Sequence, residues 1–282
     1  MKQRPWLFLL PTLLLMSISA FVPLMTVINY SLHYIFAGSM PEFVGLQNYV
    51  EVMGDTNFRQ ALFRQLVYSF IVLVIEIPLG ILIALSLPRK GRSVGLSLIL
   101  LGIPLLIPYN VVGIIWRLFS QSDIGVIPRV MSVIGYEYNV SLQSVDAFVT
   151  LLLVDIWHWT PLAALLSYAG LQAIPDAYYQ AAHVDGASTW KTFSYVTLPK
   201  LRPVLILTIL LRFMDSFKIY SEPLLLTGGG PGNATTFLSM FVARKAESYE
   251  LGYAGAVSVI YFYIVIVLSY LFFQVATRYK KE

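Results

Sequence analysis

The chain contains no cysteine, few charged residues and few histidines. Among its 282 residues, Asp, Glu, Lys and Arg together make up 12%. Without cysteine there is no disulfide framework, no thiolate nucleophile and no thiolate metal ligand. The three histidines, His33, His158 and His183, lie in different segments, so their spacing indicates neither a metal site nor a nucleophile with its base. We therefore expect no catalytic residue and no bound metal.

A phosphate-binding loop is absent as well. The glycine-rich run at 226–232 is not followed by the Gly-Lys-Ser/Thr of a nucleotide-binding loop, so it predicts a turn, and we expect no cofactor bound by this chain. The net charge of +4 does not indicate a nucleic-acid partner, because the cations lie in short loops beside apolar runs.

Apolar residues are abundant, at 57% of the chain, which is more than one soluble core can bury. The sequence therefore predicts an all-α membrane protein, with residues 1–282 forming a single transmembrane domain. For the first run, the alternative is a cleaved signal peptide, whose apolar core would end after about 7 to 15 residues. Here apolar residues continue to Met25, which favours an uncleaved span. The six expected spans are 6–30, 61–87, 94–119, 147–171, 203–225 and 251–276.

Pro104 and Pro108 lie inside the third of these spans and predict kinks there.

The positions of Lys and Arg predict the orientation of the chain in the membrane. Because short cytoplasmic loops carry an excess of Lys and Arg, both termini, the loop at 88–92 and the loop at 173–200 are expected in the cytoplasm. The outer loops are then 31–60, 120–146 and 226–250. The cations on the expected cytoplasmic side are Lys2, Arg4, Arg89, Lys90, Arg92, Lys191, Lys200, Arg202, Arg278, Lys280 and Lys281.

The loop at 173–200 is expected to fold as a helix, a turn and a second helix. Pro175 and Asp176 suit the first turn of a helix, and Gly186 can adopt the left-handed conformation that ends one. Ser188 can cap the second helix, which Pro199 is expected to terminate.

The same loop resembles the EAA loop of the membrane subunits of bacterial binding-protein-dependent ABC importers. The family pattern is Glu-Ala-Ala, three residues, Gly, nine residues, an aliphatic residue, any residue and Leu-Pro, and the spacing matches here. One departure is Gln180, which stands where the family has Glu, so a charge usually offered to the ATPase is missing. The resemblance implies that the residues that couple to an ATPase are Gln180, Ala181, Ala182, Asp185, Gly186, Ala187, Leu198 and Pro199.

Segments 226–232, 251–256 and 116–119 are similar to the MalF-type or UgpA-type half of a carbohydrate permease pair, although the Asn often found shortly after Gly125 is absent. The resemblance implies a type I ABC importer permease fold with a cytoplasmic coupling helix, in a bacterial inner membrane. It also implies the partners: a MalG-type second permease, two ATP-binding subunits that hold ATP and Mg, and an extracytoplasmic solute-binding protein. The expected solute is a sugar, a sugar alcohol, glycerol or glycerol phosphate.

Polar residues inside the spans indicate where a solute could pass, because a buried charge normally faces a cavity or a partner. In span five, Arg212, Asp215, Lys218 and Glu222 are spaced so that they would share one helical face and could neutralise one another. In span two, Glu76 precedes Pro78 and could bond to freed backbone, so no role is assigned to it. The candidate solute-path residues are Asp155, Trp157, Trp159, Asp215, Ser216 and Tyr220. For the tryptophans, the alternative is an interfacial aromatic belt.

Two other functions compete with this prediction. An ion-coupled secondary transporter of small polar solutes would require an internal repeat with broken helices at the midplane, and no such repeat is visible. An intramembrane enzyme would require a nucleophile, a base or a metal site, and the histidine spacing indicates none.

Overall fold

The computed structural model describes residues 6–37, 39–91 and 93–278. It is mostly helical, and its described residues contain one antiparallel hairpin, β1 (His33–Tyr34) with β2 (Glu42–Phe43). Contacts divide the chain into two compact units, Met1–Ala61 with Met240–Val267 and Leu62–Ser239 with Leu268–Glu282, and each is described by itself. The cations of the topology argument that lie outside the described residues are Lys2, Arg4, Arg92, Lys280 and Lys281.

Within the described part of the chain, four helices are long and apolar enough to cross a membrane. They coincide with the expected first, second, fourth and sixth spans. These helices are α1 (Trp6–Ser31), α3 (Thr56–Ser86), α7 (Ser144–Gln172) and α13 (Leu251–Arg278).

The expected third span is interrupted at its prolines. It consists of α4 (Ser93–Gly102), a short 3-10 helix η1 (Pro104–Leu106) and α5 (Tyr109–Ser120). Proline lacks the amide that a helix interior requires, and its ring clashes with the preceding turn. The kinks expected at Pro104 and Pro108 are therefore full interruptions of the helix.

The expected fifth span is also interrupted. Its first part is α10 (Leu198–Ser216), and its second part is α11 (Ser221–Thr227). The prediction that Arg212, Asp215, Lys218 and Glu222 share one helical face is therefore wrong, because Glu222 lies on a different helix. Non-helical backbone at membrane depth is tolerated where it lines a cavity or is buried in protein.

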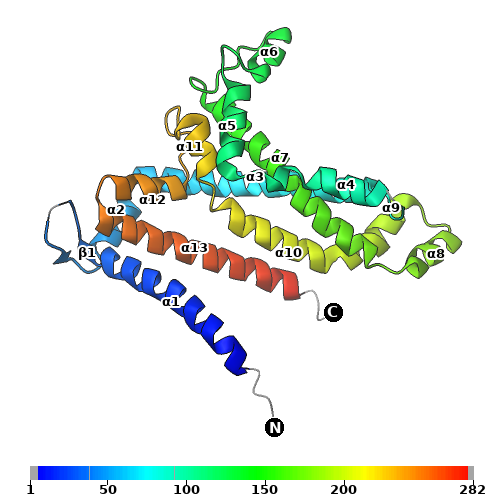
Figure 1. The fold of residues 1–282 in the computed structure, drawn as a ribbon, viewed down its shortest axis with the longest axis horizontal. Coiled ribbons are helices and arrows are strands. Elements are labelled where there is room, and N and C mark those ends of the chain that lie inside the picture. Colours follow the sequence, from blue (N-terminus) through cyan, green and yellow to red (C-terminus); the bar gives the residue numbers. More distant parts are fainter. Residues whose placement is uncertain (1–5, 38, 92, 279–282) are drawn as a thin grey trace. The chain divides into compact units, whose positions relative to one another are not determined.

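Helix α7 is the central packing partner in the larger unit, and α10 lies along it (Figure 1). Helix α3 approaches α7 at Gly80, where an added Cβ would stand 2.6 Å from the Cβ of Ala163. Only glycine allows the two backbones to come this close. Helix α5 packs against α11, so the two interrupted spans meet each other.

The segments expected as outer loops contain short helices of their own. The segment after α1 carries the β1–β2 hairpin and α2 (Gln47–Gly54). The segment after α5 carries α6 (Val126–Val133), and the segment before α13 carries α12 (Leu238–Glu247). The first two residues of the glycine-rich run at 226–232 end α11, and residues 228–232 form the expected turn.

Candidate functional site

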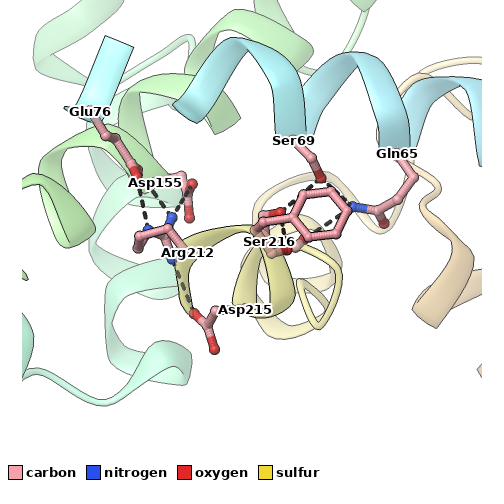
Figure 2. Close-up of polar contacts among 8 residues, drawn as sticks. Gln65, Ser69, Glu76, Asp155, Arg212, Asp215 and Ser216 are labelled. Atoms are coloured by element: carbon pink, nitrogen blue, oxygen red, sulfur yellow. Dashed lines mark hydrogen bonds and ion pairs between the residues drawn. The ribbon is translucent and has the colours of Figure 1, made fainter. Parts of the chain in front are cut away.

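Arg212 on α10 is the centre of a buried cluster of ion pairs (Figure 2). Its Nε and Nη2 lie 2.8 and 3.1 Å from the two carboxylate oxygens of Glu76 on α3. Its Nη2 also lies 2.9 Å from Asp155 on α7, and its Nη1 lies 3.1 Å from Asp215. The guanidinium carbon stands 4.5 Å from the ring centroid of Trp159. One side chain therefore joins three helices.

Burial explains why so many partners surround this arginine. The side chain of Arg212 is 1% exposed, and those of Glu76 and Asp155 are 0% and 6% exposed. An isolated buried charge costs several kcal/mol, and this cost is offset only when ion pairs and hydrogen bonds satisfy it. The planar guanidinium offers five donors, so it can serve several carboxylates at once.

The sequence analysis assigned no role to Glu76, and its expectation of bonds to freed backbone is wrong. The carboxylate binds Arg212 with both oxygens. A charge of opposite sign in another span was the signal that could have identified this pair, because intramembrane charges normally pair with each other.

A second buried cluster, also shown in Figure 2, lies about two to three helical turns nearer the N-terminus of α3. Gln65 Nε2 donates to the Ser216 carbonyl at 3.0 Å, and Ser216 Oγ lies 2.8 Å from Ser69 Oγ. Ser216 is only 2% exposed. Its hydroxyl group therefore takes part in the packing of α10 against α3, although the residue also borders the cavity described next.

A cavity of about 200 Å³ lies beside the Arg212 cluster. Five of the six expected solute-path residues line this cavity: Asp155, Trp159, Asp215, Ser216 and Tyr220. Its polar lining also includes Tyr109, Lys218 and Glu222, which were not expected on the solute path.

Trp157 is the expected solute-path residue that does not line the cavity. Asp155 and Trp159 are four residues apart and share one face of α7, whereas Trp157 lies between them on another face. There its ring meets that of Trp116 edge-on, with centroids 6.0 Å apart. It belongs to an aromatic contact between α7 and α5.

The cavity lies where the two interrupted spans meet α7. Tyr109 is the first residue of α5, directly after Pro108, and Tyr220 belongs to the break between α10 and α11. The Tyr109 ring stacks on His158 of α7 at a centroid distance of 5.6 Å. The interruptions therefore bring polar side chains from three parts of the sequence into one cavity.

The loop at 173–200 folds largely as expected. It contains α8 (Asp176–Val184) and α9 (Thr189–Thr192), separated by Gly186 at a φ of +66°. Ser188 Oγ accepts a hydrogen bond from the Lys191 amide at 3.4 Å, which caps the second helix.

The expectation that Pro199 terminates the second helix is wrong. Helix α9 continues through a π-helix, η2 (Phe193–Thr197), directly into α10. The wider hydrogen-bonding pattern of a π turn loosens the helix just before the proline, and Pro199 lies in the first turn of α10, where its missing amide is tolerated.

Most of the residues expected to couple to an ATPase are exposed on this helical hairpin. The exceptions are Ala182, which is buried, and Ala187, which is half-buried. Three large apolar side chains also project from the hairpin, Val184, Trp190 and Tyr195, which are 86%, 73% and 81% exposed. The sequence analysis missed these three. The exposed expected residues are Gln180, Ala181, Asp185, Gly186, Leu198 and Pro199.

The cationic loop after α3 lies against this hairpin. Arg89 Nη1 and Lys90 Nζ each lie 3.9 Å from the carboxylate of Asp176, and the Arg89 guanidinium carbon is 4.6 Å from the Tyr179 ring centroid. Between the hairpin and the end of α3 runs an apolar groove of about 960 Å³, bordered by Leu82 and Trp190. The cationic loop at 88–92 and the loop at 173–200 therefore lie on the same side of the larger unit.

A family model described as "Binding-protein-dependent transport system inner membrane component" matches residues 76–279. The chain belongs to this family. The matched region includes α10, the hairpin, the Arg212 cluster and the residues that line the cavity.

Two relatives and one solved structure extend the comparison. The trehalose/maltose transport system permease protein MalF of Thermococcus litoralis is 33% identical over 98% of this chain and 94% of its own length. The sulfoquinovosyl glycerol transport system permease protein SmoG of Agrobacterium fabrum is 30% identical over 91% of this chain and 84% of its own length. The fold matches a chain of a bacterial alginate ABC transporter, solved with an alginate pentasaccharide-bound periplasmic protein, with a TM-score of 0.83 at 22% identity over 99% and 96% of the two chains.

These similarities identify the chain as a permease subunit of an ABC importer, which is a transport subunit of the inner membrane. The alternative of an ion-coupled secondary transporter is not favoured.

Replacing Arg212 with Met is expected to destabilise the protein strongly. The substitution leaves the carboxylates of Glu76 and Asp155 buried without their cation, and breaking a buried pair in this way costs about 3 to 5 kcal/mol. The measurement is the thermal unfolding midpoint of the purified protein in detergent.

Lys218→Met is the matched control, because it removes a cation from the same region. The Lys218 side chain is 73% exposed, and its Nζ lies 3.7 Å from the carboxylate of Asp215. Exposed pairs contribute little to stability. Equal midpoints for the two variants would contradict the assignment of Arg212 as a buried structural centre.

Proposed function

We propose that the chain forms half of the translocation path of a carbohydrate importer and that the hairpin of α8 and α9 couples it to an ATPase. The observation that carries this proposal is the hairpin itself, whose EAA-like residues lie on an exposed helix-turn-helix. A helix exposed in this way can be seated in a groove of a partner protein.

The proposed partners are a MalG-type second permease, two ATP-binding subunits and an extracytoplasmic solute-binding protein. ATP and Mg are held, and ATP is hydrolysed, by the ATP-binding subunits. Family membership supports this assembly, and the solved relative was crystallised with its periplasmic protein.

We infer six membrane passes, with both termini in the cytoplasm. Four passes are the continuous helices, and the other two are the interrupted pairs α4–α5 and α10–α11. The contact of Asp176 with Arg89 and Lys90 supports this topology, because it joins the cationic loop to the hairpin. Loops rich in Lys and Arg remain cytoplasmic.

The proposed coupling is mechanical. The hairpin continues through η2 into α10 without a break in helical structure, and α10 ends beside the cavity. From Leu198 to Asp215 the helix rises about 25 Å, at about 1.5 Å per residue. A displacement of the hairpin by the ATPase would therefore reach the cavity along one helix.

Gly186→Val is expected to uncouple ATP hydrolysis from uptake. Gly186 has a φ of +66°, which valine adopts only with strain, so the turn between α8 and α9 would be distorted. We expect solute uptake by the reconstituted importer to fall by roughly tenfold, a typical magnitude for coupling between sites, while membrane insertion is retained.

Gly135→Val is the matched control. Gly135 has a φ of +76°, and, as at Gly186, a Cβ would meet no atom within 4 Å, but it lies in the segment after α6. The strain is thus alike and only the location differs. Normal coupled uptake by the Gly186 variant would count against the hairpin as the coupling element.

The cavity beside the Arg212 cluster is the proposed solute contact of this subunit. Tyr220→Ala is expected to reduce uptake by about three- to tenfold, the value of one lost hydrogen bond to a sugar hydroxyl, with the importer still assembled. Trp157→Ala removes an aromatic ring of α7 that does not line the cavity, so it should reduce uptake less. Unaltered uptake kinetics in the Tyr220 variant would remove the cavity from the solute path.

The charge of the cavity disfavours an anionic solute. The carboxylates of Asp155, Asp215 and Glu222 line it, whereas Lys218 is its one lining cation among the described residues. Arg212 lies behind this lining and is already bound to carboxylates. The names of the relatives include both neutral and sulfonated sugars, so family membership leaves the solute's charge open.

We therefore expect the solute-binding protein of this importer to prefer neutral sugars or sugar alcohols. The measurement is calorimetric titration of the purified binding protein with trehalose, maltose, glycerol and glycerol 3-phosphate. Tight binding of glycerol 3-phosphate, together with its uptake by the importer, would contradict the assignment of a neutral solute.

A further inference from the structure

Helix α2 (Gln47–Gly54), together with its N-cap residue Leu46, has three distinct faces. On the first face, Asn48 and Val52 are buried inside the smaller unit, to which α2 belongs. Leu46, Val50 and Met53 form an apolar stripe and are 67%, 72% and 61% exposed. The third face is polar and carries Gln47 and Glu51. Because residues spaced three and four apart lie on one side of a helix, the apolar stripe is continuous.

Two hydrogen bonds fix the position of α2 at the end of a membrane span. Asn48 Nδ2 donates to the carbonyl of Ser31 at 2.9 Å and to that of His33 at 3.0 Å. Ser31 is the last residue of α1, one of the apolar helices long enough to cross a membrane. Ser31 Oγ also lies 2.6 Å from Tyr49 Oη. Helix α2 is thus held at the C-terminal end of α1.

The surroundings of the stripe match the boundary between lipid and water. Tyr30 in the last turn of α1 and Tyr34 in the following strand β1 are 39% and 51% exposed, and tyrosine is enriched at this level of membrane proteins. On the polar face, Gln47 Nε2 donates to Glu51 at 2.9 Å, so the only charge on the exposed part of α2 lies away from the stripe.

We propose that α2 lies in the plane of the membrane at the outer end of α1, with Leu46, Val50 and Met53 among lipid acyl chains and with Gln47 and Glu51 facing water. An amphipathic helix lying in the interface buries its apolar face about 5 to 10 Å into the boundary between headgroups and acyl chains. The occupant of the stripe is lipid, because α2 is hydrogen-bonded to the end of α1, an exposed apolar helix long enough to cross a membrane. This contact would hold the outer end of α1 at a fixed depth.

The absence of cysteine from the chain allows a direct test. Val50→Cys and Met53→Cys place a single thiol on the apolar stripe, and Gln47→Cys and Glu51→Cys are the matched controls on the polar face of the same helix. The complete importer is labelled with the fluorophore NBD and reconstituted in vesicles of phosphatidylethanolamine and phosphatidylglycerol. The importer with the unsubstituted chain gives the background from thiols of the other subunits.

Quenching by a lipid with a nitroxide headgroup is then compared with quenching by aqueous iodide. We expect the nitroxide lipid to quench the Val50 and Met53 labels at least about three-fold more than the Gln47 and Glu51 labels, and iodide to show the opposite order. Iodide quenching of the Val50 label equal to that of the Glu51 label would overturn the proposal. So would shielding of the Val50 label that arises only when the solute-binding protein is added, because a protein surface would then cover the stripe.

Discussion

The buried pairing of Arg212 with three carboxylates is the constraint on which the larger unit depends. An unpaired charge at this depth would cost more than most single contacts contribute, so α3, α7 and α10 must present Glu76, Asp155 and Asp215 at one place. The close approach of α3 to α7 at Gly80 lies one helical turn beyond Glu76, and it fixes the separation that the ion pairs require. Packing and charge pairing therefore determine the same arrangement of helices.

The two interrupted spans create the polar cavity next to this cluster. A continuous helix satisfies its own backbone groups and offers lipid an apolar surface, whereas an interruption frees backbone groups and redirects side chains. The break after Ser216 and the prolines before Tyr109 place Tyr109, Lys218 and Tyr220 around one volume against α7. Helices α5 and α11 pack against each other and contribute Tyr109 and Glu222 to the lining of the cavity.

Local sequence signals predicted much of this structure, but they could not predict ion pairs between residues far apart in the sequence. Pro175, Gly186 and Ser188 predicted the helical hairpin because capping and left-handed turns depend on a few neighbouring residues. Glu76 and Arg212 are 136 positions apart, so their contact depends on how three helices pack. The end of α10 at Ser216 had no local signal, since residues 217–220 include neither proline nor glycine. The π-helix before Pro199 was missed because proline alone normally indicates a helix end.

The continuity of α10 with the hairpin limits where the chain can bend in the proposed transport cycle. A regular helix transmits displacement with little deformation, and the Arg212 cluster resists rotation of α10 relative to α3 and α7 because rotation would separate buried charges. The remaining compliant points are the π-helix Phe193–Thr197 and the non-helical residues 217–220, which lie at the two ends of α10. A displacement of the hairpin would therefore bend the chain either at Phe193–Thr197 or at residues 217–220. The second point borders the cavity, so movement of residues 217–220 would displace part of the cavity lining.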